Sequence, residues 1–176
     1  MGKVVSRQRI TGLSVICEPT SEILGIINDV EYDPEDNKIN GIIAIGIRNN
    51  KVFSIPLDYV LDFSESKVTV RSNLTKHPKS EAQSSFKDKK VVWGDNIELG
   101  FISNIIFDPE SGQIKEYEVS QGIIDDFIMG RKLLAGHFRL NPADEVVKIS
   151  SDQNIELKSN NKGILNILSG NDRLYN

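Results

Sequence analysis

The chain has 176 residues, of which 39% are hydrophobic and 26% charged, and its formal net charge is −4. This is the composition of a soluble globular protein with room for one ordinary domain or two small ones. No apolar run approaches the roughly 20 residues of a membrane-spanning helix, and the N-terminal apolar stretch is too short for a secretory signal, so we expect a cytoplasmic protein without membrane insertion.

Alternating apolar residues predict a β-hairpin near the start of the chain. Residues 24, 26, 30 and 32 are apolar at a period of two, with Asn28 as the polar member of that face, which indicates a half-buried strand. The turn at 33–37 contains a proline that presets φ and ends in Asn37, a residue type that tolerates left-handed φ. Alternation resumes from Ile39 to Ile47 and predicts the second strand of the hairpin.

Shorter strands are expected on both sides of this hairpin. One precedes it at 13–17 and ends in Cys17, the single cysteine, which we expect to be a small buried hydrophobe. With one cysteine, an internal disulfide bond and a cysteine-built zinc site are excluded. Two more strands, at 51–55 and 67–70, flank a connecting turn at 56–60.

The hairpin sequence occurs twice, 75 residues apart. Aligning 24–39 with 99–114 needs no gap, and seven of the sixteen pairs are identical. Three further pairs, Ile26 with Phe101, Val30 with Ile105 and Tyr32 with Phe107, keep a large apolar side chain. We therefore predict two copies of one small β module in tandem.

The second copy differs from the first by an insertion of about four residues. Its expected first strand is 91–93 and its expected last strand is 146–149, where the offset between copies has grown to 79. The insertion falls around 121–132, where Ile123, Ile124, Phe127 and Ile128 have helical spacing. This pattern predicts a short helix that turns one apolar face inward.

Between the copies lies a polar linker, and after them a tail. The predicted organisation is 1–72 for the first module, 73–89 for the linker, 90–150 for the second module and 151–176 for the tail. Residues 71–90 carry six basic and two acidic side chains, but apart from Phe86 they lack the interleaved aromatics of a nucleic-acid site, and the flanking modules are acidic. In the tail, residues 163–168 (Gly-Ile-Leu-Asn-Ile-Leu) suggest a short amphipathic helix that caps a module or meets a partner.

We predict no catalytic, cofactor-binding or metal-binding residues. His77 and His137 are two isolated histidines, too few for the usual histidine-rich metal site. The acidic turn with Asp33, Glu35 and Asn37 resembles a calcium loop, but lysine and alanine stand where that loop needs glycine and glutamate, so a hairpin turn is expected. Adjacent Asp125 and Asp126 point about 100° apart on a helix and do not converge, which predicts a solvated helix face.

These residues together resemble the PRC-barrel domain family, in its bacterial form with two barrels in tandem. In the first copy the resemblance lies in residues 12–16, Leu24-Gly25, Tyr32-Asp33-Pro34 and 55–60 (Ile-Pro-Leu-Asp-Tyr-Val); in the second it lies in 117–122 and 130–132. The second copy departs from the pattern, because 133–136 (Leu-Leu-Ala-Gly) replaces the Ile-Pro element. The resemblance implies an all-β fold with minor helix, made of two small antiparallel barrels, and a role in binding or assembly rather than catalysis.

Three functions are consistent with this sequence. The first is a non-catalytic adaptor or assembly module that binds a protein partner. The alternatives are a ribosome- or RNA-associated maturation factor that uses the basic linker, and a small-ligand binder or enzyme that uses the junction between the barrels. Because a domain of about 60 residues is marginally stable alone, we also expect a pseudo-twofold pair of barrels or a homodimer.

Overall fold

The computed structural model describes residues 3–33, 36–71, 77–78, 88–95, 97–136, 144–152 and 155–159. Its contacts divide the chain into two units. The first unit is Met1–Ser85 together with Ile106–Ile114, and the second is Phe86–Ile105 together with Lys115–Asn176. The predicted boundaries at 72, 89 and 150 stay a prediction, and each unit is described by itself below.

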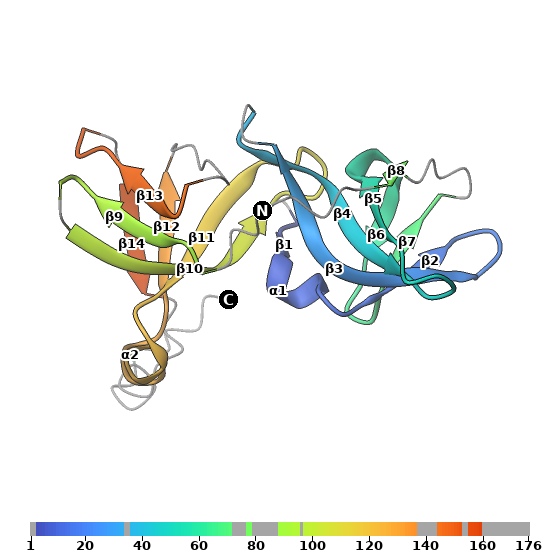
Figure 1. Ribbon diagram of the computed structural model, residues 1–176, viewed down its shortest axis with the longest axis horizontal. Helices are drawn as coiled ribbons and strands as arrows, with labels where there is room; N and C mark the ends of the chain where they lie inside the picture. Colours follow the sequence, from blue (N-terminus) through green and yellow to red (C-terminus); the bar gives the residue numbers. More distant parts are fainter. Residues whose placement is uncertain are drawn as a thin grey trace. The chain divides into compact units, whose positions relative to one another are not determined.

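The first unit is built on one sheet with the strand order β6-β7-β2-β3-β4-β5-β8 (Figure 1). Its centre is the long hairpin of β3 and β4, and β2 and β7 pair in parallel while the other neighbours are antiparallel. The strands are β2 (Ser14–Cys17), β3 (Ile23–Asp33), β4 (Lys38–Gly46), β5 (Val52–Pro56), β6 (Val60–Phe63), β7 (Lys67–Val70) and β8 (His77–Pro78), with the 3-10 turn η1 (Leu57–Tyr59) between β5 and β6.

The second unit has a sheet of the order β13-β9-β10-β11-β12-β14. Here β9 and β13 are the parallel pair. Its elements are β9 (Lys90–Trp93), β10 (Ile97–Phe107), β11 (Ile114–Ser120), α2 (Ile123–Met129), β12 (Lys132–Gly136), β13 (Val146–Ile149) and β14 (Ile155–Ser159). In the described part of the chain no pairing joins the outer strands of either sheet, so the barrel closure that the resemblance implies is not seen.

Five strands follow the same order in both sheets. The path β7-β2-β3-β4-β5 corresponds to β13-β9-β10-β11-β12, and the parallel pair lies at the same place in each. The register also shifts at the same point, because Val15 pairs with Gly25 and Val91 with Gly100, and the residue before each glycine, Leu24 or Leu99, is skipped. This is a β-bulge at equivalent positions.

The bulges change which side chains reach the core. The sequence predicted that residues 24, 26, 30 and 32 share one buried face, and this is wrong for the first half of β3. A second register shift between Ile27 and Asp29 changes the alternation, so that Ile27 is 1% exposed and Ile26 is 45% exposed. A single extra residue moves every following side chain to the other face of a strand.

Each unit has its own apolar core, made of the strand residues that face inward. The predicted buried position of Cys17 is confirmed, at 6% exposed. The fully buried side chains of the first unit include Val15, Ile27, Ile39, Ile42, Ile55, Val68 and Val70, and those of the second include Val91, Ile102, Ile105, Tyr117, Val119, Leu134 and Ile149.

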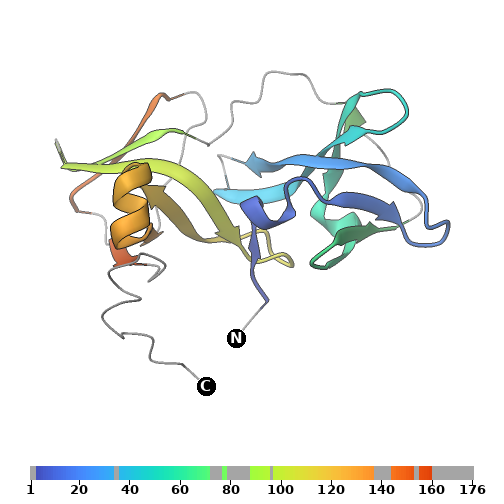
Figure 2. The ribbon, with the colours of Figure 1, turned by 90° about the horizontal axis from the view of Figure 1, so that it is seen from below.

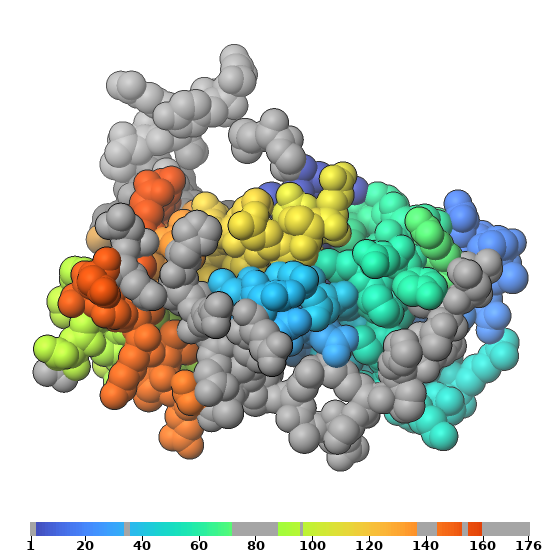
Figure 3. All heavy atoms as spheres, turned by 90° about the horizontal axis from the view of Figure 1, so that it is seen from above, coloured from blue at the N-terminus to red at the C-terminus, as the bar shows by residue number. Residues whose placement is uncertain are grey.

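A hairpin turn from the second copy completes the first unit. The buried Phe107 packs edge-to-face on Phe63, with ring centroids 6.3 Å apart, and pairs with Val5 of the short strand β1 (Val5–Ser6). Lys38 forms an isolated antiparallel bridge with Gln113, its own equivalent 75 residues later. Figure 3 shows the start of β4, in light blue, beside the turn between β10 and β11, in yellow.

The N-terminal helix α1 (Arg7–Ile10) is held on β3 by an ion pair. Arg7 Nε lies 2.5 Å from Asp29 Oδ1, and both side chains are mostly buried. The carboxylate of Asp29 also accepts the backbone N–H of Val30 at 2.8 Å. The elements that the sequence did not predict are β1, α1, β6, β8, β12 and β14. Of these, β8 lies in the stretch assigned to the linker and β14 in the stretch assigned to the tail.

Candidate functional site

Helix α2 occupies the connection between β11 and β12. It is flanked by Gly122 (φ 130°) and Gly130 (φ 78°), two positions with the positive φ that glycine adopts without steric cost. The Gly122 N–H donates to Ser120 Oγ at 3.2 Å, and the Gly130 N–H donates to the Asp126 carbonyl at 3.0 Å. The two glycines therefore let the chain turn sharply into the helix and back into the sheet.

The apolar side chains of α2 are exposed. Five of its seven residues are large and apolar, and they are between 38% and 90% exposed: Ile123, Ile124, Phe127, Ile128 and Met129. The helix projects beyond the ends of its strands, and Figure 2, seen from below, shows it in front of its sheet. The prediction of an inward apolar face is therefore wrong, since no residue of this helix is buried.

A polar cluster links α2 to the sheet. Asp126 Oδ1 accepts the Gln121 N–H at 3.2 Å, while its Oδ2 lies 3.3 Å from Arg131 Nε. Arg131 also reaches Glu118 of β11, with 3.3 Å between Nη1 and Oε2. The predicted solvated face is thus wrong for Asp126, because this carboxylate points toward the sheet and the apolar residues point away. Asp125 is exposed and makes no ion pair with any described residue.

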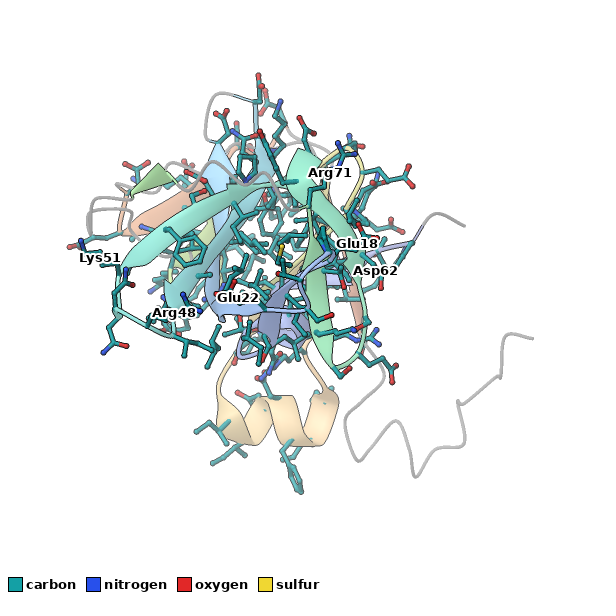
Figure 4. The ribbon with its side chains drawn as sticks, turned by 90° about the vertical axis from the view of Figure 1, so that its right-hand side faces the viewer. Glu18, Glu22, Arg48, Lys51, Asp62 and Arg71 are labelled. Atoms are coloured by element: carbon teal, nitrogen blue, oxygen red, sulfur yellow. The ribbon has the colours of Figure 1, made fainter. Side chains whose placement is uncertain are left out.

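The equivalent connection in the first unit borders a pocket of about 250 Å³. Its lining includes the apolar residues Ile23, Leu24, Val52 and Phe53 and the charged residues Glu22, Arg48 and Lys51. Arg48 pairs with Glu22 at 2.8 Å, and Figure 4 shows both side chains together with Lys51 nearer the edge. Glu18, Asp62 and Arg71 lie on the opposite side of the same view, so acids and bases are mixed at this end of the unit.

The outer face of this sheet also exposes isoleucines. Ile26 and Ile45 are cross-strand neighbours, and Ile23 and Ile47 are exposed close by. Ile23 and Ile26 lie in β3 and Ile45 lies in β4, whereas Ile47 lies in the turn that follows β4.

The predicted turn residues act as turn residues. Asp33 accepts hydrogen bonds from the Asp36 N–H and the Asn40 side chain, and Asp108 accepts from the N–H groups of Glu110 and Ser111. Asn37 and Gly112 both have positive φ, as predicted. Among the described residues there is no group of three or more His, Cys, Asp or Glu side chains that could hold a metal ion.

Several sequence predictions fall on residues that the structure does not describe. They are Glu35, His137, the side chain of His77, most of the basic linker and the apolar tail segment. No helix within the described ranges is long and apolar enough to span a membrane.

Comparison with known proteins gives one family. The PRC-barrel domain model matches residues 78–160, which include every strand from β9 to β14. The first copy lies outside this match, and no curated protein matches the chain. The chain thus contains a PRC-barrel domain, at residues 78–160.

Proposed function

We propose that this protein is a non-catalytic binding module that docks onto a partner protein through the apolar face of α2. The observation that carries the proposal is the exposure of five large apolar side chains on one seven-residue helix. Burying one such side chain contributes about 1.5–3 kcal/mol, so leaving all five in water is unfavourable. Exposed apolar surfaces of this kind are typical of protein–protein contacts.

The chemistry of the helix indicates the partner. Phe127 follows Ile123 by four residues, and Ile128 follows Ile124 by four, which is the spacing of side chains that enter an apolar groove together. The exposed carboxylate of Asp125 borders these residues. We therefore infer a partner with an apolar groove rimmed by lysine or arginine, because opposite charges at the rim increase the association rate and specificity.

We also propose that the first copy, residues 1–72, is a second module of the PRC type. The support is the shared strand order, the parallel strand pair at the same place, and the bulge at Leu24 and Leu99. In this proposal the second copy acquired α2 in its connection between β11 and β12. The equivalent connection in the first copy, between β4 and β5, borders the pocket. One module would then present the docking helix while the other stabilises the chain.

The test is affinity capture from the native lysate with matched variants. Phe127→Ser with Ile124→Ser removes two anchors from α2, and Ile26→Ser with Ile45→Ser removes two exposed isoleucines from the first unit. We expect a discrete protein to be captured by the unchanged chain and the control, and lost with the α2 variant. The purified partner should bind the unchanged chain and the isoleucine variant more tightly than the α2 variant. Asp125→Lys should also weaken the binding of this partner, most strongly at low salt.

Two outcomes would reject the proposal. Capture that survives the α2 variant but is lost with the isoleucine variant would move the site to the first unit. Capture of ribosomal proteins that are released by RNase, with strong dependence on salt, would support the RNA-associated alternative instead.

A further inference from the structure

The pocket of the first unit combines apolar lining residues with two basic side chains. We propose that it binds a small organic carboxylate, an acid whose single negative charge is attached to an aromatic or branched aliphatic body. The inference goes beyond the proposed function, because every residue that lines the pocket belongs to the first unit and α2 belongs to the second. It therefore names a second site with a different class of ligand.

The size of the pocket suits a ligand with one ring. Its volume is about 250 Å³. In another protein, an apolar cavity of about 150 Å³ holds one benzene molecule. The larger volume here leaves room for a short chain and a carboxylate beside the ring.

The least exposed residues of the lining are apolar. Phe53 is 6% exposed, and Leu24 and Val52 are half-buried. Leu24 is the bulge residue that the strand pairing skips, and its equivalent in the second copy, Leu99, is only 5% exposed. The first copy thus leaves this leucine partly open at the pocket, where the apolar body of a ligand would remove it from water.

The two basic residues come from one hydrogen-bonded turn. Residues 46–51 include Arg48 and Lys51 and no acid. The Gly46 N–H donates to the Lys51 carbonyl at 2.9 Å, and the Asn50 N–H donates to the Gly46 carbonyl at 3.0 Å. These bonds fix the backbone of both basic residues beside the pocket before a ligand binds, and such preorganisation lowers the entropic cost of binding.

The charges of the lining leave one positive charge for a ligand. Arg48 Nη2 lies 2.8 Å from Glu22 Oε1, whereas Lys51 makes no ion pair with any described residue. Figure 4 shows these three side chains on the same side of the unit. A guanidinium has five N–H donors, so Arg48 can keep its contact with Glu22 and still donate to a ligand. Two cations and one acid therefore favour a monoanion over a neutral molecule or a cation.

Titration of the purified full-length chain with phenylpropionate tests the site. In NMR spectra, the backbone amides of residues 22–24 and 46–53 should shift and saturate, with a dissociation constant of about 1–5 mM for a ligand of about eleven non-hydrogen atoms. Phenylpropionamide has the same ring and chain without the charge, and it should bind about tenfold more weakly. Acetate has the charge without the ring, and it should cause no saturating shift.

A matched pair of lysine variants locates the charge that recognises the ligand. Lys51→Met removes the cation that has no acidic partner among the described residues, and we expect it to weaken phenylpropionate binding about tenfold. Lys67→Met is the control, because Lys67 is an exposed lysine of β7 in the same unit that does not line the pocket. It should change the affinity by less than about twofold. Both side chains are exposed, so neither variant should disturb the fold.

Four results would overturn the inference. They are the absence of saturation up to about 20 mM phenylpropionate, saturating shifts confined to residues outside the pocket, equal binding of the acid and its amide, and equal effects of the two lysine variants. Failure of lysate capture would leave the titration unaffected, so the two proposals are separately testable.

Discussion

Two glycines let neighbouring strands come closer than a side chain would allow. A Cβ atom on Gly25 would lie 2.6 Å from the carbonyl oxygen of Ile45, and one on Gly100 would lie 2.3 Å from that of Ser120. The two contacts are related by the 75-residue offset. The repeat therefore preserves a close backbone approach as well as a sequence, and glycine is required there because any side chain would collide with backbone.

Replacing Gly100 by alanine should be much more harmful than a glycine substitution without a collision. Gly12 is the matched control, since it also has positive φ but a Cβ atom on it would meet no other atom within 4 Å. We expect Gly12→Ala to lower the free energy of unfolding by about 1–2 kcal/mol, because alanine is strained at this positive φ. Gly100→Ala should cost about 1–3 kcal/mol more because the strands must move apart. Urea unfolding of both variants measures the difference, and equal costs would contradict the close approach.

At the scale of single elements, the orientation of α2 follows from one polar cluster. Asp126, Arg131 and Glu118 connect the helix to β11, and the side chain of Glu118 is only 11% exposed. The apolar side chains point outward because the polar side of the helix is the one held at the sheet. The orientation of the exposed apolar side chains thus depends on residues that are not among them.

Removing Arg131 should loosen the helix and leave the mostly buried Glu118 without its cation. We expect Arg131→Met to cost roughly 1–3 kcal/mol, as for a buried polar group that loses a charged partner. Lys158→Met is the control, because its ion pair with Glu156 is well exposed and should be worth less than about 1 kcal/mol. Thermal unfolding with hydrogen exchange of α2 checks both. Similar losses in the two variants would show that Arg131 does not hold the helix.

Local pattern predicted the elements better than it predicted their faces. The strands at 67–70 and 146–149 were predicted at their observed bounds, and the helix was predicted within the insertion. The faces of β3 were wrong because bulges at Leu24 and Asn28 leave no mark on apolar spacing. The predicted orientation of α2 was wrong because apolar spacing does not tell which side of a helix contacts the sheet. That side is set by the ion pair of Asp126 with Arg131, two residues separated by a glycine with positive φ.

At the scale of the whole molecule, neither unit is a continuous stretch of chain. Ile106–Ile114 belongs to the first unit by its contacts, although it is the hairpin turn of the second copy. The sequence predicted two successive modules, because the repeat and the linker are local features. Contacts such as that between Ile39 N–H and the Gly112 carbonyl, at 2.8 Å, join residues far apart in the chain and could not be predicted from either copy alone.

This arrangement predicts that a substitution in the second copy destabilises the first unit. Phe107 is completely buried between β1 and Phe63, so Phe107→Ala should cost about 3–5 kcal/mol through lost burial and a cavity. Phe101→Ala is the control on the same strand, since that ring is 43% exposed and should cost much less. In this variant, the backbone amides of β2, β3 and β7 in the first sheet should exchange faster with solvent. If exchange increased only in β9, β12 and β13, the two copies would be independent modules and the hairpin turn a surface contact. The expected result would instead make the two copies one folding unit, in which the module that carries α2 also completes its neighbour.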